Sequence, residues 1–118
     1  MPGRPLIDDE AAAYLREPTV LHWVAEGGGV VVGHLLSYVE LRRAGEPRQL
    51  LLYEIGVREA SRRRGVGTAL VEAMRRWMRD ERVDGAWVLA DNPEAEAFYA
   101  TCGFTRDDEQ AVQMTLRL

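Results

Sequence analysis

An apolar strand that runs into a loop of arginine and glycine, and then directly into an amphipathic helix, constrains this chain more than any other feature. The strand ends in Tyr53–Val57 and the loop spans Arg62–Thr68. Such a loop can direct several backbone N–H groups at one point, and the helix N-terminus adds its partial positive charge. The sequence therefore predicts a socket for a phosphate or pyrophosphate group at this turn.

Two well-known glycine-rich loops do not fit these residues. A Walker-type loop needs Gly-Lys-Ser/Thr, and no lysine is present here. A dinucleotide-binding fingerprint needs a third glycine where this chain has Leu70, whose side chain would enter the helix–strand contact. Neither nucleoside triphosphate hydrolysis nor dinucleotide binding is predicted.

Length and composition indicate a single globular domain over residues 1–118. The hydrophobic content of 47% and the charged content of 29% are ordinary for such a domain. No run approaches the roughly 20 apolar residues of a membrane span, and the N-terminus lacks the apolar core of a signal peptide. Cys102 is the only cysteine, so no internal disulfide can form, which favours the cytoplasm.

Charge is distributed unevenly along the chain. The formal net charge of −4 argues against a general binder of polyanions, and nucleic acid is not an expected partner. Arginines gather in the middle of the sequence: Arg58, Arg62, Arg63, Arg64, Arg75, Arg76 and Arg79. A basic island in an acidic molecule suits an anionic cofactor and a cationic substrate. Solvated surface charge is an alternative explanation for most of these side chains.

Hydrophobic periodicity predicts a mixed α/β domain around one sheet. Strands are expected at 20–26, 30–41, 50–57, 86–90 and 112–118, the first two as a hairpin. Helices are expected at 11–15, across the amphipathic stretch 70–79, and from Pro93 to Gly103. Asn92 is expected to cap the last helix, and Phe104 to fold back over its final turn.

Two gapped patterns resemble the GNAT superfamily of N-acetyltransferases. The first, Arg62-x-x-Gly65-x-Gly67 after an Ile-Gly-Val strand, resembles that family's acetyl-coenzyme A loop. The second is Asn92-x-x-Ala95-x-x-Phe98-Tyr99-x-x-x-Gly103-Phe104. The resemblance covers roughly residue 20 to the C-terminus. It implies a central, mostly antiparallel sheet that is flanked by helices and splayed at Val57 and Trp87.

The resemblance also implies how acetyl-coenzyme A is held. Its pyrophosphate would lie on the loop formed by Arg62, Arg63, Arg64, Gly65, Val66, Gly67 and Thr68. Backbone amides near Ile55 and Val57 would bind the pantetheine arm and the thioester carbonyl, an oxyanion-type contact. Asn92 would help to hold the same arm, with plain helix capping as the alternative. No metal is expected.

Two side chains are candidates for catalysis. Tyr99 would act as the general acid that protonates the departing thiolate; the alternative is a tyrosine that only packs in the core. Glu54 would take a proton from the amine, or would only bind a cationic substrate. Tyr53, the preceding residue, is expected to point to the opposite face of the sheet.

Other reactive side chains are assigned structural positions. His22 and His34 alternate with apolar residues in predicted strands, and no cluster with metal-ligand spacing accompanies them. Cys102 is interpreted as a small buried apolar residue.

The chain departs from the family pattern at its N-terminus, where only one short helix precedes residue 20 and Arg4–Ile7 is at best a poor first strand. An exposed sheet edge at 20–26 follows, so we expect a homodimer or another partner to cover it. The nearest resemblance within the superfamily is to aminoglycoside 3-N-acetyltransferases, through Tyr53–Val57 and the nearby segments 37–39 and 46–48.

The function implied is transfer of an acetyl group from acetyl-coenzyme A to a primary amine. The acceptor would be a small molecule, such as an aminoglycoside or polyamine, or a peptide. The alternative is a sensor or interaction module that binds an acyl-coenzyme A without turnover.

Overall fold

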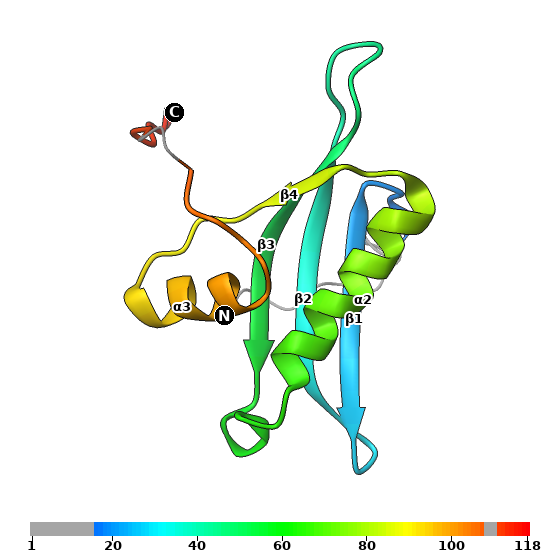
Figure 1. Ribbon diagram of the computed structural model, residues 1–118, viewed down its shortest axis with the longest axis vertical. Helices are drawn as coiled ribbons and strands as arrows, with labels where there is room; N and C mark the ends of the chain where they lie inside the picture. The colour runs from blue at the N-terminus through cyan, green and yellow to red at the C-terminus, as the bar shows by residue number, and fades with distance from the viewer. Residues whose placement is uncertain (1–15, 108–110) are drawn as a thin grey trace.

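The computed structural model describes residues 16–107 and 111–118. Within them, four strands form one sheet in the order β1-β2-β3-β4 (Figure 1). The elements in chain order are β1 (Val20–Gly27), β2 (Val30–Glu40), β3 (Gln49–Val57), the 3₁₀ helix η1 (Glu59–Ser61), α2 (Val66–Glu81), β4 (Gly85–Trp87) and α3 (Pro93–Thr101). This is the mixed α/β architecture that the sequence predicts.

The sheet is mostly antiparallel, as predicted. β1 pairs with β2 and β2 pairs with β3 in antiparallel register, whereas β3 and β4 run parallel. The turn between β1 and β2 is made by Gly28 and Gly29, both with positive φ. Among the described residues, β1 has no strand on its outer side, so the exposed edge expected at 20–26 is present there.

Helix α2 covers one face of the sheet (Figure 1). Its buried residues Leu70, Val71 and Met74 recur at helical spacing and belong to one cluster with strand residues. Alternation along β2 puts Leu35, Ser37 and Val39 on the face beneath α2. The Ser37 hydroxyl is fully buried and donates to the Met74 sulfur over 3.4 Å. The helix is thus fixed by its apolar face, as its sequence period predicts.

Helix α3 begins and ends at the residues that the sequence indicates. Asn92 Oδ1 accepts from the Ala95 backbone N–H over 2.8 Å, and Pro93 opens the helix. At the other end Gly103 has a φ of 99°. The Phe104 N–H then reaches back to the Tyr99 carbonyl over 3.0 Å, which is the hydrogen bond of a Schellman motif.

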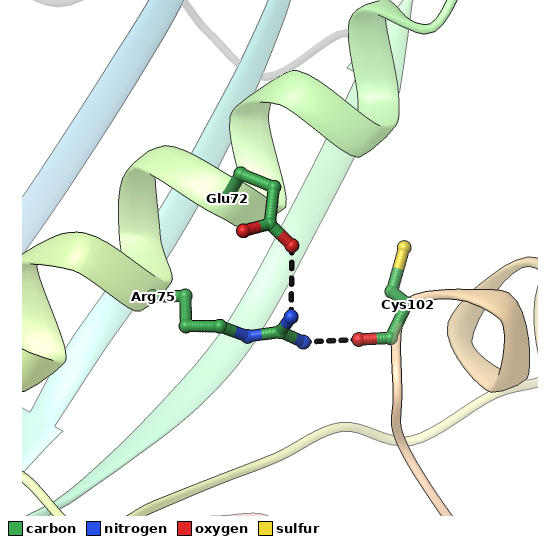
Figure 2. Close-up of polar contacts among 3 residues, drawn as sticks. All are labelled: Glu72, Arg75 and Cys102. Carbon is green, nitrogen blue, oxygen red and sulfur yellow. Dashed lines mark hydrogen bonds and ion pairs between the residues drawn. The ribbon is translucent and has the colours of Figure 1, made fainter.

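Arg75 ties α2 to the C-terminal end of α3 (Figure 2). One guanidinium nitrogen bonds Glu72 over 2.8 Å within α2, and the other donates to the Cys102 carbonyl. That carbonyl lies at a helix C-terminus, where positive charge is favourable. Arg75 is therefore used for packing, although the sequence groups it with the basic island.

Two predicted strands differ in the structure. β4 ends at Trp87 rather than at residue 90, and Leu89 is 63% exposed, so the segment is not a buried strand. Residues 111–118 form no strand, and their apolar side chains at 112, 114, 116 and 118 are exposed. An alternating pattern predicts which side chains share a face of a strand, but it does not predict which strand lies beside it. A strand needs that neighbouring strand to pair its backbone N–H and C=O groups.

Three expectations fall on residues 1–15 and so lie outside the described residues. They are the helix at 11–15, the poor strand at Arg4–Ile7 and the short N-terminal region as a whole. In the part of the chain that the structure describes, no helix is long and apolar enough to cross a membrane.

Candidate functional site

β3 and β4 pair only briefly and then separate. Their parallel register joins Gln49 with Gly85, Leu50 with Ala86, and Leu51 with Trp87. β3 continues to Val57 without further pairing to β4, so from residue 52 onward its backbone makes no ladder hydrogen bonds with β4. The splay expected between Val57 and Trp87 is therefore present, and it opens toward the loop that precedes α2.

The loop after β3 is folded back on the strand that leads into it. Arg62 Nε donates to the Val57 carbonyl over 3.1 Å, and the Arg58 N–H donates to the Val32 carbonyl over 2.8 Å. Arg63 has a φ of 65°, unusual for a residue with a side chain. These contacts leave Arg62, Arg63 and Arg64 exposed around the start of α2.

Gly65 caps the N-terminus of α2 in the left-handed conformation, with a φ of 78°. No side chain caps this helix end, and no acidic residue lies in its first turn. The helix's free N–H groups and partial positive charge are thus available to an anion. A Cβ built on Gly65 would meet no heavy atom within 4 Å, so space is open here. That the loop residues Arg62 to Thr68 hold a pyrophosphate stays a prediction.

Gly67 has a second reason to lack a side chain. A Cβ at this position would lie 3.0 Å from the Phe98 ring. The sequence predicts a glycine here for close approach of the cofactor, and the structure adds close approach of α3. Val66 is half-buried at the same turn, and Thr68 is exposed.

Tyr99 is buried, with 9% of its surface exposed, and its ring contacts those of Phe98 and Phe104. Burial raises the pKa of Tyr99 above its ordinary value, with smaller contributions from Asp91 and Cys102. The hydroxyl is therefore protonated at neutral pH, as a general acid must be. The core position that the sequence analysis weighed as the alternative is observed, and it is compatible with acid catalysis.

Glu54 and Tyr53 lie on the same face of the sheet, and the expectation that they point to opposite faces is wrong. Glu54 pairs with Leu36 while Leu52 pairs with Ser37, which leaves Tyr53 as an extra residue in a β-bulge. The Tyr53 ring lies 5.2 Å from that of Tyr38, centroid to centroid. A bulge shifts the strand's alternation by one residue, and alternation is what the expectation relied on.

The bulge brings Glu54 to His34, a pairing that the sequence analysis missed. His34 Nε2 lies 2.7 Å from Glu54 Oε1, and both side chains are one-third exposed. His34 also lines a pocket of about 250 Å³ with Gly33, Gly56 and Val57, at the start of β2 and the end of β3. The sequence gives only a weak indication of this contact, because the two residues lie on different strands. A bulge determines whether their side chains lie on the same face of the sheet.

The remaining candidates occupy separate places. Tyr99 belongs to the buried cluster that includes α2, whereas Glu54 lies on the face of β3 turned away from α2. Asn92 caps α3 and its Nδ2 donates to Asp91. Cys102 is buried, and burial raises the pKa of its thiol. Within residues 16–107 and 111–118, no cluster of three or more His, Cys, Asp or Glu is placed to hold a metal ion.

Comparison with known proteins agrees with this geometry. The sequence profile of the acetyltransferase (GNAT) family matches residues 2–104, so the chain belongs to that family. A curated relative, N-acetyltransferase family 8 member 2 of Rattus norvegicus, is 29% identical over 98 residues. That match covers 81% of this chain and 43% of the relative, so the chain spans less than half of the relative's length.

Solved structures with the same fold include aminoglycoside acetyltransferases. One is the enzyme meta-AAC0020, from an uncultured soil metagenomic sample, in complex with sisomicin; its TM-score is 0.86 at 25% identity, covering 100% of this chain and 79% of that one. Another is aminoglycoside N-acetyltransferase AAC(6')-Iy in complex with CoA, with a TM-score of 0.78 at 19% identity, covering 93% and 85%. These likenesses establish the fold.

Proposed function

We propose that this chain is an N-acetyltransferase that moves an acetyl group from acetyl-coenzyme A to a primary amine. The observation that carries the proposal is the opening between β3 and β4, which leads to an uncapped helix N-terminus. A thioester carrier needs both parts, because its arm needs free strand amides and its pyrophosphate needs an anion site. Family membership and the CoA complex of a structural neighbour support this choice of carrier.

The residues take roles that the geometry supports. The loop from Arg62 to Thr68 receives the pyrophosphate, and the free amides near Ile55 and Val57 receive the pantetheine arm and the thioester carbonyl. Asn92 borders the arm while capping α3, and Tyr99 protonates the departing thiolate. Transfer is direct, without a covalent enzyme intermediate, so positioning and electrostatics supply most of the acceleration.

The acceptor is a cationic amine of the aminoglycoside or polyamine type, or a peptide amine. The sisomicin complex of a structural neighbour supports the first class. The acidic residues give weaker support, because Glu46 pairs with Arg42 over 3.3 Å and Glu40 accepts a hydrogen bond from Trp87. A panel of amines must therefore decide the acceptor.

Calorimetric titration with acetyl-coenzyme A, followed by a free-thiol assay over an amine panel, tests the proposal. Gly65→Glu is the critical variant, and Gly45→Glu is its matched control, since both glycines have positive φ and open space around a built Cβ. We expect Gly65→Glu to weaken binding at least tenfold, and Gly45→Glu to leave it unchanged. Equal binding by both variants would contradict the anion socket. Binding without turnover on any amine would favour an acyl-coenzyme A sensor.

A homodimer is part of the proposal. The outer edge of β1 has no strand partner among residues 16–107 and 111–118, and unpaired edges favour association. Light scattering at micromolar concentration would contradict the dimer if it gave a monomeric mass. We place the protein in the cytoplasm, because its one cysteine is a free thiol.

A further inference from the structure

His34 and Glu54 form a polar pair across strands β2 and β3. The 2.7 Å between His34 Nε2 and Glu54 Oε1 is a short, strong contact. Each side chain is one-third exposed, so an incoming molecule can reach the pair. Both residues lie on the face of the sheet turned away from α2, which leaves the pair outside the apolar core.

The contact with Glu54 fixes which ring nitrogen of His34 is basic. A carboxylate oxygen accepts hydrogen bonds, so we assign the N–H of this contact to Nε2, which leaves Nδ1 as the ring nitrogen that does not contact Glu54. A Cβ built on Gly56 would lie 2.7 Å from the ring's Cε1 and 3.3 Å from Nδ1. The ring therefore rests on the backbone of Gly56, between the two residues whose amides are assigned to the thioester.

Other polar groups around the ring come from β1 and from the loop after β3. The His22 ring meets that of His34 edge-on, with centroids 5.8 Å apart. Burial lowers the pKa of His22, the nearby His34 lowers it further, and Glu54 opposes this. His22 is thus neutral at neutral pH. Arg58 lines the same pocket as His34. Of these groups, only His34 is paired with a carboxylate.

We propose that Nδ1 of His34 is the base that takes a proton from the acceptor ammonium group, and that Glu54 positions the ring instead of acting as the base. This inference rests on the proposed function and adds a residue to it. His34 is assigned as the base of the pair because its Nδ1 makes no contact with Glu54 and its ring lies over Gly56, between Ile55 and Val57. Glu54 acts through His34, by holding its orientation and stabilising the imidazolium.

The transfer balances with these groups. An ammonium group loses its first proton to His34 Nδ1, and the freed lone pair forms the C–N bond to the acetyl carbon. The C–S bond breaks, and its electron pair stays on sulfur. Tyr99 protonates the thiolate and regains its proton from water, and the second proton that the nitrogen loses also passes to water. His34 then releases its proton to water.

The pH profile of kcat/KM tests the assignment, with a panel amine that the wild-type protein acetylates. The wild type should show an acid limb, a loss of activity as the pH falls, because a general base must be unprotonated to accept a proton. We expect His34→Gln to lose this acid limb and at least 100-fold in kcat/KM. His22→Gln, a histidine on the same face, should keep the limb. An unchanged limb in His34→Gln would overturn the assignment.

Glu54→Gln separates a positioning role from a basic one. Without the carboxylate the ring loses the partner that orients it, so kcat/KM should fall while the acid limb persists. If the limb vanished in Glu54→Gln and persisted in His34→Gln, Glu54 would be the base and the inference would be wrong.

Two further measurements show whether the variant is folded and whether the ring has the proposed tautomer. The dissociation constant of acetyl-coenzyme A should be unchanged in His34→Gln, which shows that the variant is folded. Nitrogen chemical shifts of the ring in the wild-type protein should identify the Nε2–H tautomer, and the opposite tautomer would overturn the inference without any assay. Acetyl-coenzyme A binding with no turnover on any amine would refute the proposed function, and the inference with it.

Discussion

Because Tyr99 is buried, its hydroxyl stays protonated over a wide pH range. Because burial raises the pKa of this phenol, the charged form is disfavoured and the group stays protonated up to at least its ordinary value of about 10. Tyr99→Phe keeps the ring contacts with Phe98 and Phe104 and removes only the hydroxyl group. We expect kcat to fall about 100-fold at neutral pH, measured with saturating acetyl-coenzyme A.

Tyr53→Phe is the control for that substitution, because Tyr53 is 60% exposed at the bulge. Its kcat should stay within twofold of the wild type. Wild-type kcat for Tyr99→Phe at every pH would remove Tyr99 from the mechanism and leave it a core residue.

Cys102 offers a second prediction at the scale of one residue. Its side chain is 5% exposed, and burial raises the pKa of the thiol, so little thiolate forms at neutral pH. Alkylation by iodoacetamide at pH 7.5, followed by mass spectrometry, should be slow in the native protein and fast in urea. Rapid modification of the folded chain would show that the end of α3 opens readily.

The structural role of a residue could be predicted from the sequence where it depends on contacts within its own segment. It could not be predicted where it depends on pairing with a neighbouring strand. The cap at Asn92 and the turn at Gly103 depend on their own segment, and both are confirmed. The face of the sheet on which Glu54 lies depends on a β-bulge opposite β2, and no pattern in the sequence of β3 predicts that bulge. The sequence therefore predicts only a structural position for His34, whereas the structure pairs it with Glu54.

At the scale of the element, Asn92 at the start of α3 has two roles that can be tested separately: it caps the helix, and we propose that it holds the pantetheine arm. The side-chain oxygen accepts the Ala95 N–H, so Asn92→Ala should cost about 1 kcal/mol in the free energy of unfolding, measured with urea. Asn92→Asp keeps an oxygen for the cap and should keep the stability. If Asn92 also holds the pantetheine arm, Asn92→Asp should raise the KM for acetyl-coenzyme A. An unchanged KM would leave only the cap.

The link between α2 and α3 depends on Arg75. Replacing it with alanine removes a charged donor from the Cys102 carbonyl and from Glu72, so the free energy of unfolding should fall by about 1–2 kcal/mol. Arg76→Ala, at the adjacent exposed position, should change it by less than about 0.5 kcal/mol. Equal effects in thermal unfolding would mean that the link in Figure 2 contributes nothing.

Elements with an internal hydrophobic period were predictable, and elements that need an external partner were less so. The period of α2 and the alternation of β2 each place a buried face, and both are confirmed. The segment at 111–118 has an equally clear alternation but forms no strand. Its pattern carries no information about which backbone would pair with it.

At the scale of the whole molecule, ligand binding should be visible as stability. A ligand that binds only the folded chain stabilises it by about 2.7 kcal/mol at a free concentration of 100 Kd. For a chain of this size the Tm should rise by roughly 10 °C with acetyl-coenzyme A. Pantetheine, which lacks the pyrophosphate, should give a much smaller shift at the same concentration. Equal shifts would mean that the loop before α2 does not grip the diphosphate.

The extra residue at Tyr53 sets the chemistry of both surfaces of β3 at once. Before Tyr53, Leu50 and Leu52 point into the apolar core. After it, Glu54 lies on the opposite face of the sheet. Deleting that one residue would leave Leu52 and Glu54 in regular alternation, each still opposite its present partner on β2. The carboxylate would stay on the opposite face from the core, and the loss would be the ring contact between Tyr53 and Tyr38. A one-residue deletion at this position should therefore leave a folded chain with Glu54 still outside the core.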